Sequence, residues 1–119
     1  MKFSKDHEWV KLEGETAIIG ITDYAAHQLG DVTYVELPTV GNKLTQGKSF
    51  STVESVKTVS DVFAPMSGEV TEVNEELDGN PAIVNEDPMG KGWIAKINYS
   101  NKAEYDTLLD EAAYKEICK

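Results

Sequence analysis

The strongest constraint on the fold is a run of β-prone residues at positions 47–62 (GKSFSTVESVKTVSDV). Serine, threonine and valine dominate the run, and β-branched residues favour strands. After Gly47 it contains no Gly, Pro or Asn that would mark a turn. Sixteen residues are nevertheless too many for an ordinary strand. We therefore expect the run to bend, although strand propensity does not show where.

The rest of the chain is also rich in candidate strands. Five further segments either alternate apolar and polar residues or concentrate β-branched ones, with turn-forming residues between them. These segments are residues 8–12, 16–21, 31–37, 69–73 and 92–98. Together with the long run, they predict an α+β fold that is mainly antiparallel β.

Short helices are predicted at two places between the strands. Thr22 is a candidate N-cap, and Gly30 can end the following helix in a left-handed conformation. Residues 80–85 can form a single helical turn that begins at Pro81.

The C-terminal segment is predicted to be helical at residues 101–117. Asn101 with Glu104 three residues later fits a capping box, and Asp110 can cap a second helix that ends near Ile117. An apolar stripe should hold these helices against the core. The residues of this stripe are Leu108, Leu109, Ala112 and Ile117.

Residues 32–44 and 59–71 resemble each other at an offset of 27 positions. The aligned identities are Val32 with Val59, Val35 with Val62, Pro38 with Pro65, and Gly41 with Gly68. One interpretation is that a strand ending in a Pro-x-x-Gly turn is used twice, in the two halves of a pseudo-symmetric sandwich. The other is coincidence, because Pro and Gly recur in any β-rich chain.

The charge balance excludes some classes of partner. The 119 residues carry a formal net charge of −10, and all 11 basic residues are lysine. Without arginine, an acidic chain is poorly suited to bind nucleic acid. The negative charge either attracts basic protein partners or only keeps the chain in solution.

The sequence gives no sign of a membrane segment, a targeting segment or a metal site. It has no apolar run of about 18 residues and no signal-peptide pattern at its N-terminus. We therefore expect a cytoplasmic protein without a membrane partner. Cys118 is the single cysteine, and His7 and His27 do not have metal-ligand spacing, so no metal is expected.

No motif of an enzyme is present, but one lysine is noteworthy. The chain contains no P-loop, no GxGxxG and no GxSxG. Lys57 lies inside the β-prone run, between Val56 and Thr58. Its position alone is compatible with an ordinary solvent-facing lysine of a strand.

Residues 53–61 (VESVKTVSD) resemble the lipoyl-attachment segment of the glycine cleavage system H proteins. The resemblance extends over nearly the whole chain as blocks in the family's order, which is more specific than one short motif. The other blocks are residues 7–10 (HEWV), 20–25 (GITDYA), 29–31 (LGD), 35–38 (VELP), 64–70 (APMSGEV), 72–74 (EVN), 85–88 (NEDP) and 92–93 (GW).

The resemblance implies a lipoyl-type barrel-sandwich hybrid with short peripheral helices and a C-terminal helical segment. It implies one lipoyl-carrier domain over residues 1–119, with its lipoyl-like core at about 16–98 and its helices at about 101–117. Lys57 would occupy the tip of a hairpin and carry lipoate in amide linkage. The hairpin supplies the bend that strand propensity leaves open.

The same resemblance implies a non-catalytic carrier subunit, which we expect to be a monomer. Its lipoyl arm would take the aminomethyl group of glycine from the glycine decarboxylase (P-protein) to the aminomethyltransferase (T-protein). The dihydrolipoyl dehydrogenase (L-protein) would then reoxidise the arm. A lipoate-attaching enzyme would be a further partner.

By resemblance, Glu8 and Asp61 are candidates to hold the ammonium of the loaded arm in a cleft that excludes water. Both can also be ordinary surface acids. The family has a histidine directly before the Leu-Gly that ends the first helix, but this chain has Gln28 there and its histidine at His27. Gln28 can donate a hydrogen bond to a docked arm but does not titrate near neutrality.

Several alternatives remain open from the sequence. Val56 and Thr58 argue against a biotin carrier, which places methionine on both sides of its lysine. They also argue against the lipoyl domain of a 2-oxoacid dehydrogenase, which has Asp before the lysine and Ala after it. A lipoate relay to other complexes, an unmodified acidic interaction module and an enzyme that acts alone are the other possibilities.

Overall fold

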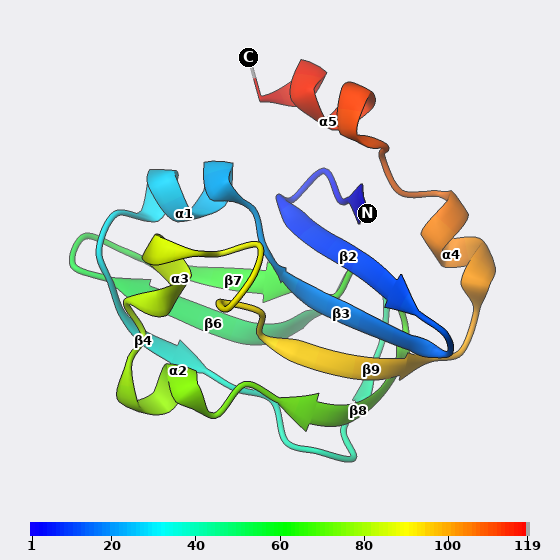
Figure 1. Ribbon diagram of the computed structural model, residues 1–119, viewed down its shortest axis with the longest axis horizontal. Helices are drawn as coiled ribbons and strands as arrows, with labels where there is room; N and C mark the ends of the chain where they lie inside the picture. Colours follow the sequence, from blue (N-terminus) through cyan, green and yellow to red (C-terminus); the bar gives the residue numbers. More distant parts are fainter. Residues whose placement is uncertain (119) are drawn as a thin grey trace.

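Backbone pairing places the strands of this computed structural model, which describes residues 1–118, in two antiparallel sheets (Figure 1). The six-stranded sheet has the order β1 (Lys2–Phe3), β2 (Glu8–Glu13), β3 (Thr16–Ile21), β9 (Ala95–Tyr99), β8 (Gly68–Val73) and β5 (Lys43–Leu44). The three-stranded sheet has the order β4 (Val32–Glu36), β6 (Ser49–Ser55) and β7 (Val59–Phe63). The helices are α1 (Asp23–Leu29), α2 (Glu76–Gly79), α3 (Ile83–Glu86), α4 (Lys102–Asp106) and α5 (Glu111–Ile117). The expectation of a mainly β fold with short helices is confirmed.

The β-prone run at residues 47–62 folds into the β6–β7 hairpin, with Glu54 opposite Val59 at the last paired position. The side chain of Ser55 closes the turn, which contains no glycine. Ser55 donates its amide to the carbonyl of Thr58 at 2.8 Å. The Ser55 hydroxyl oxygen accepts from the amides of Lys57 at 3.3 Å and Thr58 at 3.2 Å. No residue of this turn has a positive φ, so turn-residue rules do not detect it.

The two similar segments follow equivalent paths through the fold. Strands β4 and β7 flank β6 in the small sheet. After β4 the backbone crosses to the large sheet as β5, and after β7 it crosses as β8, and β5 pairs with β8. The aligned Val35 and Val62 are both buried. The aligned glycines differ in role: Gly41 has a φ of +97°, whereas a Cβ on Gly68 would lie 2.6 Å from the carbonyl oxygen of Asn98. The topology favours the pseudo-symmetric interpretation over coincidence.

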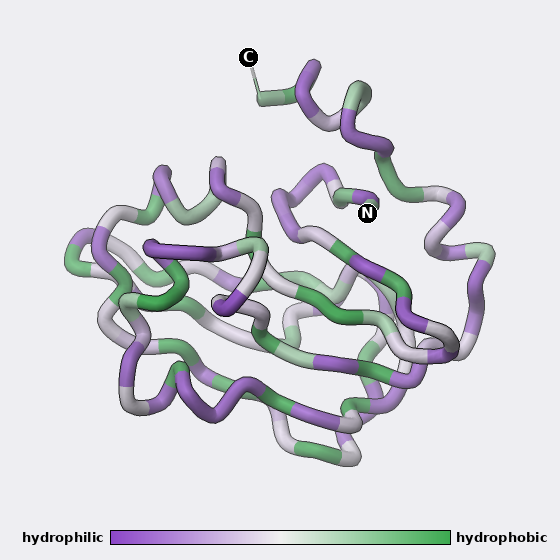
Figure 2. Tube along the Cα trace, in the orientation of Figure 1, coloured by the Kyte–Doolittle hydropathy of each residue, from purple (hydrophilic) through white to green (hydrophobic). Residues whose placement is uncertain are grey.

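Two apolar clusters fill the space between the sheets and beneath the helices. The first joins α1, α2 and α3 to the small sheet, and the second joins β2, β3, β8 and β9. Phe50 packs against both clusters. Figure 2 shows the alternation of hydrophobic and hydrophilic residues along β9, which is typical of a strand with one buried face.

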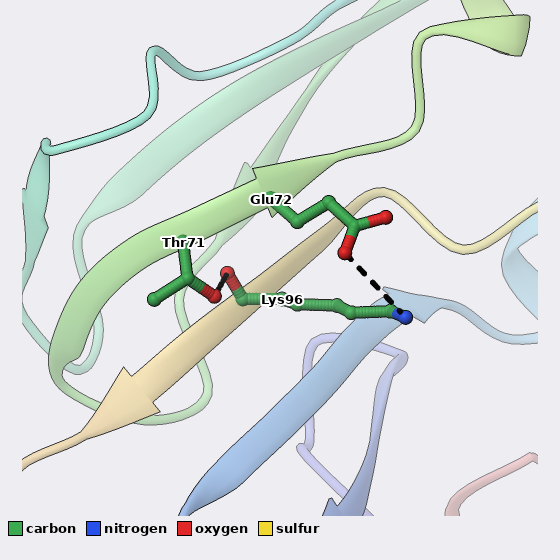
Figure 3. A network of polar contacts seen from close by, with 3 residues as sticks. All are labelled: Thr71, Glu72 and Lys96. Atoms are coloured by element: carbon green, nitrogen blue, oxygen red, sulfur yellow. Dashed lines mark hydrogen bonds and ion pairs between the residues drawn. The ribbon is translucent and has the colours of Figure 1, made fainter.

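A register shift between Val70 and Glu72 interrupts the pairing of β8 with β9 and leaves Thr71 as the extra residue. The hydroxyl of Thr71 donates to the carbonyl of Lys96 at 3.2 Å, and Lys96 Nζ lies 3.8 Å from Glu72 Oε1 (Figure 3). Such a bulge bends the strand and increases its twist, which is needed where the sheet curves around the core.

The C-terminal helices form as predicted, but they use other contacts. Asn101 and Asp110 cap α4 and α5. The carboxylate of Glu104 accepts from the amide and hydroxyl of Ser67 at 2.7 and 2.9 Å, and so fixes α4 to the sheet. The predicted apolar stripe is wrong at Ala112 and Ile117, which are exposed. The buried residue of α5 is Tyr114, which stacks on the ring of Phe3.

Other limits differ from the prediction as well. Strands β2, β4 and β8 differ by one residue at one or both ends, and α3 begins at Ile83, two residues after Pro81. The last strand begins at Ala95, three residues later than Gly92, because the amide of Gly92 bonds the carbonyl of Asp87 in a loop. Helix α2 was not predicted, since its four residues carry no capping signal. None of the helices in the described part of the chain is long and apolar enough to cross a membrane.

Candidate functional site

Lys57 lies at the exposed tip of the β6–β7 hairpin, which projects at one end of the molecule (Figure 1). Its neighbours Val56 and Val59 are also exposed, at 71% and 60%. Among residues 1–118, no carboxylate forms an ion pair with the Lys57 amine. The amine is therefore available to an enzyme that approaches the tip.

The stem of Lys57 rests on the backbone of Gly30, which follows α1. Gly30 has a φ of +77° and a ψ of −156°, a region that is almost restricted to glycine. A Cβ at this position would lie 3.4 Å from Lys57 Cε. Glycine at position 30 thus serves both the end of the helix and the close approach of the lysine stem.

A cleft of about 160 Å³ lies beside β7, the strand that follows the tip. Helix α1 forms one wall, β7 forms the other, and the segment before β2 closes the end. Glu8, Gln28 and Asp61, the three candidates for arm docking, all line it. The other lining residues are Asp6, His7, Ile21, Tyr24, Ala25, Leu29, Val53, Ser60 and Val62. The fold therefore brings together three residues that are far apart in the sequence.

Glu8 is the buried acid of the cleft, with only 2% of its surface exposed. Its Oε1 accepts a hydrogen bond from the hydroxyl of Ser4, and its Oε2 accepts from the amide of Phe63 at 3.3 Å. Burial raises the pKa of Glu8 to about 7, and the negative charge of Asp6 acts in the same direction, whereas the two hydrogen bonds oppose it. The protonated form of this carboxyl group therefore persists to a much higher pH than in an exposed glutamate.

Asp61 and Gln28 lie on opposite walls and are both exposed. Asp61 Oδ1 accepts from the hydroxyl of Ser49 at 3.1 Å, so this carboxylate is also held by β6. His27, the residue before Gln28, lines a different hollow together with Asp23 and Asn85. Gln28 lines both hollows, whereas His27 lines only the second and is not part of the cleft.

Sequence reasoning missed His7 as a residue of the site. Its φ of +69° is the single positive value at a non-glycine residue of the described chain. The ring stacks on Tyr24 at a centroid distance of 4.5 Å, and Nδ1 lies 2.7 Å from the hydroxyl of Tyr114. Burial lowers the pKa of His7, so the neutral ring is favoured. The block at residues 7–10 was the available signal, but it drew attention to Glu8 alone.

The residues present fit a lipoyl group. An exposed amine on a rigid turn can form the amide, and a lysine stem with a lipoyl chain reaches roughly 14 Å. The adjoining cleft has apolar side chains, Ile21 and Val62 among them, and a buried acid at its end. An apolar ring and a cationic group could therefore both be accommodated there.

Two packed sheets with an exposed lysine at a hairpin tip define the class of lipoyl-type domains. The family model for the glycine cleavage H-protein matches residues 1–119. The chain is 56% identical to the glycine cleavage system H protein of Xanthobacter autotrophicus, covering 98% of this chain and 93% of that protein. It is 55% identical to that of Symbiobacterium thermophilum, covering 100% of this chain and 93% of the relative.

The fold gives the same result. The crystal structure of a glycine cleavage system H protein from Mycobacterium marinum matches with a TM-score of 0.85 and 35% identity, over 97% of this chain and 93% of that one. The chain belongs to the glycine cleavage system H protein family. This confirms the barrel-sandwich hybrid fold that the resemblance implied.

Proposed function

We propose that this chain carries lipoate on Lys57 and moves the aminomethyl group of glycine from the P-protein decarboxylase to the T-protein aminomethyltransferase. The L-protein dehydrogenase then reoxidises the dithiol. The observation that carries this proposal is Lys57, exposed at a hairpin tip and without an ion pair to residues 1–118, beside a cleft that contains Glu8, Gln28 and Asp61. When bound, the lipoyl group supplies the redox and carrier chemistry.

Lys57 contributes a nucleophile in a defined place. An enzyme that attaches lipoate must bring an activated carboxyl group to Nζ. The amine loses a proton as the amide forms, and the activating group leaves the carboxyl carbon. The exposure of the tip gives the enzyme access, and the hydrogen bonds that the amides of Lys57 and Thr58 donate to the Ser55 hydroxyl oxygen restrict the backbone around Lys57.

The cleft protects and orients the loaded arm. Glu8 and Asp61 offer carboxylate oxygens to an ammonium group, and Gln28 offers an amide N–H. A cation that enters the cleft favours the ionised form of Glu8 and so lowers its pKa. The apolar wall excludes water from the carried group.

The whole chain, residues 1–119, acts as one carrier domain in this proposal, with the lipoyl-like core and the C-terminal helices as a unit. We propose that it works as a monomer in the cytoplasm. Its net charge of −10 favours partner enzymes with basic docking faces.

Intact-mass spectrometry tests the attachment. After expression with lipoate available, we expect a lipoyl-sized mass increment that peptide mapping places on Lys57. A Lys57→Arg variant keeps the charge and should show no increment. Lys48 precedes the hairpin and provides a matched control, since Lys48→Arg should be modified like the wild type. A modified Lys57→Arg variant would place the attachment elsewhere.

The role of the cleft is tested by the lifetime of the loaded form. Glu8→Gln and Asp61→Asn remove a charge at the cleft, and we expect each to shorten the lifetime of the aminomethyl-loaded protein by several-fold. The measurement follows the decay of the loaded mass after removal of glycine and decarboxylase. Asp78→Asn on α2 changes the same net charge away from the cleft and should leave the lifetime unchanged. Equal lifetimes in all variants would remove Glu8 and Asp61 from the site.

A further inference from the structure

Asn85 of α3 uses both ends of its side-chain amide. Its Oδ1 accepts from the amide of Val32 at 2.8 Å, and its Nδ2 donates to the carbonyl of Gly30 at 2.7 Å. Gly30 lies in the short connection from α1 to β4, and Val32 is the first residue of β4, so both ends of this segment are held. Asparagine is suited to this place because its short side chain carries one donor group and one acceptor.

The same connecting segment contacts the hairpin tip. The carbonyl of Asp31 accepts from the amide of Val56 at 3.0 Å. Gly30 lies beneath the stem of Lys57, and a Cβ there would be 3.4 Å from Cε and 3.9 Å from Nζ. A continuous series of contacts therefore runs from Asn85 through residues 30–32 to the backbone and stem of the tip.

Helix α3 is held in place by packing against the core. Ile83 and Val84 are buried in the core cluster beneath the helices, and α3 packs against α1. Asn85 itself is exposed, so packing does not require an amide at this position. The block at residues 85–88 thus contains a residue that neither the core nor the cleft explains.

We propose that Asn85 is a positioning residue for the lipoylation of Lys57. It holds the connecting segment in the conformation that seats the lysine stem and accepts the Val56 amide. An attaching enzyme then meets the amine in one geometry, and it need not select that geometry from a mobile ensemble. The inference rests on the proposed function, since the position of Lys57 matters for attachment only if lipoate is attached there.

The main experiment measures the initial rate of lipoylation of the full chain in its unmodified form. A lipoate ligase, ATP and lipoic acid are the reagents, and intact mass is the readout. We expect kcat/KM to fall roughly five- to tenfold in Asn85→Ala, which loses both hydrogen bonds. Asn85→Asp keeps the acceptor for Val32 but places a negative oxygen against the carbonyl of Gly30, and we expect a decrease of at least threefold, on the order of one lost hydrogen bond.

Asn74 provides the matched control. Its Nδ2 donates to the carbonyls of Lys91 and Trp93, both at 2.8 Å, and it is more deeply buried than Asn85. Asn74→Ala should reduce the stability at least as much as Asn85→Ala without changing the rate of lipoylation. Chemical denaturation of each variant verifies that the comparison is made on folded protein.

A second readout does not depend on lipoate. Amide hydrogen exchange reports the bond from Val56 to Asp31, and we expect exchange at Val56 to accelerate roughly tenfold in Asn85→Ala but not in Asn74→Ala. Wild-type lipoylation rates in both Asn85 variants would overturn the inference, as would equal slowing in the Asn74 control. A wild-type chain that the ligase leaves unmodified would instead overturn the proposed function, whatever the exchange data show.

Discussion

The hairpin tip and the far end of the cleft beside it hold charged groups in opposite surroundings. At the tip, Lys57 is exposed, and no ion pair to it exists within residues 1–118. At the other end, Glu8 is almost fully buried, with hydrogen bonds from Ser4 and Phe63. Lys57 is thus accessible to other molecules, whereas buried Glu8 can interact strongly with a charge that enters the cleft.

The difference follows from the electrostatics of each place. An amine that several enzymes must reach cannot be enclosed, so its own hydration stabilises its charge. In the proposed function Glu8 holds a cation, and such a pair gains from low dielectric, because water and salt screen an exposed pair. The carboxylate of Glu8 is therefore poorly solvated when the cleft holds no cation. This burial raises the pKa of Glu8 to about 7.

The largest predicted effect concerns this buried end. In the folded chain the pKa of Glu8 is about 7, compared with an ordinary 4.5, so the folded state binds more protons than the unfolded state between these values. The stability that protonated Glu8 contributes is greatest at low pH and is lost as the pH rises toward 7 and above. The difference amounts to about 2–3 kcal/mol between roughly pH 5 and 8.

Glu8→Gln cannot titrate and should lack this component. We expect the free energy of unfolding of the wild type, relative to the variant, to fall by about 2–3 kcal/mol over that pH range. Urea denaturation at several pH values measures it, and Asp78→Asn serves as the exposed control. A wild-type to Glu8→Gln difference that does not change with pH would mean that Glu8 ionises normally, and the contrast between the two ends would disappear.

A smaller effect is expected at the tip, from Gly30→Ala. The backbone of Gly30 occupies a region that costs other residues about 1–3 kcal/mol, and the new Cβ would press on the stem of Lys57. We expect a loss of about 2 kcal/mol in the free energy of unfolding. Gly79→Ala is the matched control, because its φ is not positive and nothing lies within 4 Å of its Cβ position. Equal stabilities of the two variants would show that residue 30 has no special conformation.

The sequence predicts the strands better than it predicts the turns and the cleft. Residues 16–21 were predicted with the correct limits, because their composition reflects a local preference for extended backbone. The hairpin tip had no such signal, since its turn depends on the Ser55 side chain and not on a glycine. Only the resemblance indicated that Lys57 lies there.

The cleft depends on contacts between distant residues, which no local pattern encodes. Glu8 lies between a histidine and a tryptophan, and nothing in that spacing shows that its carboxylate meets the amide of Phe63, 55 positions later. The error at the C-terminus has the same origin. Helical periodicity favoured Ile117, whereas the bond of the Tyr114 hydroxyl to Thr22 at 2.6 Å determines which face of α5 is buried.

The smallest effect should come from removing the charge at the exposed end. Lys57→Gln keeps part of the aliphatic stem on Gly30 and removes an amine that forms no ion pair with any of residues 1–118. We expect the free energy of unfolding of the unmodified chain to change by less than about 0.5 kcal/mol at any pH. The same chemical change, a charged side chain to glutamine, would then have a strongly pH-dependent effect at residue 8 and almost none at residue 57. A loss above about 1 kcal/mol in Lys57→Gln would mean that the lysine helps to hold the hairpin, so that its attachment function and its stability would not be separable.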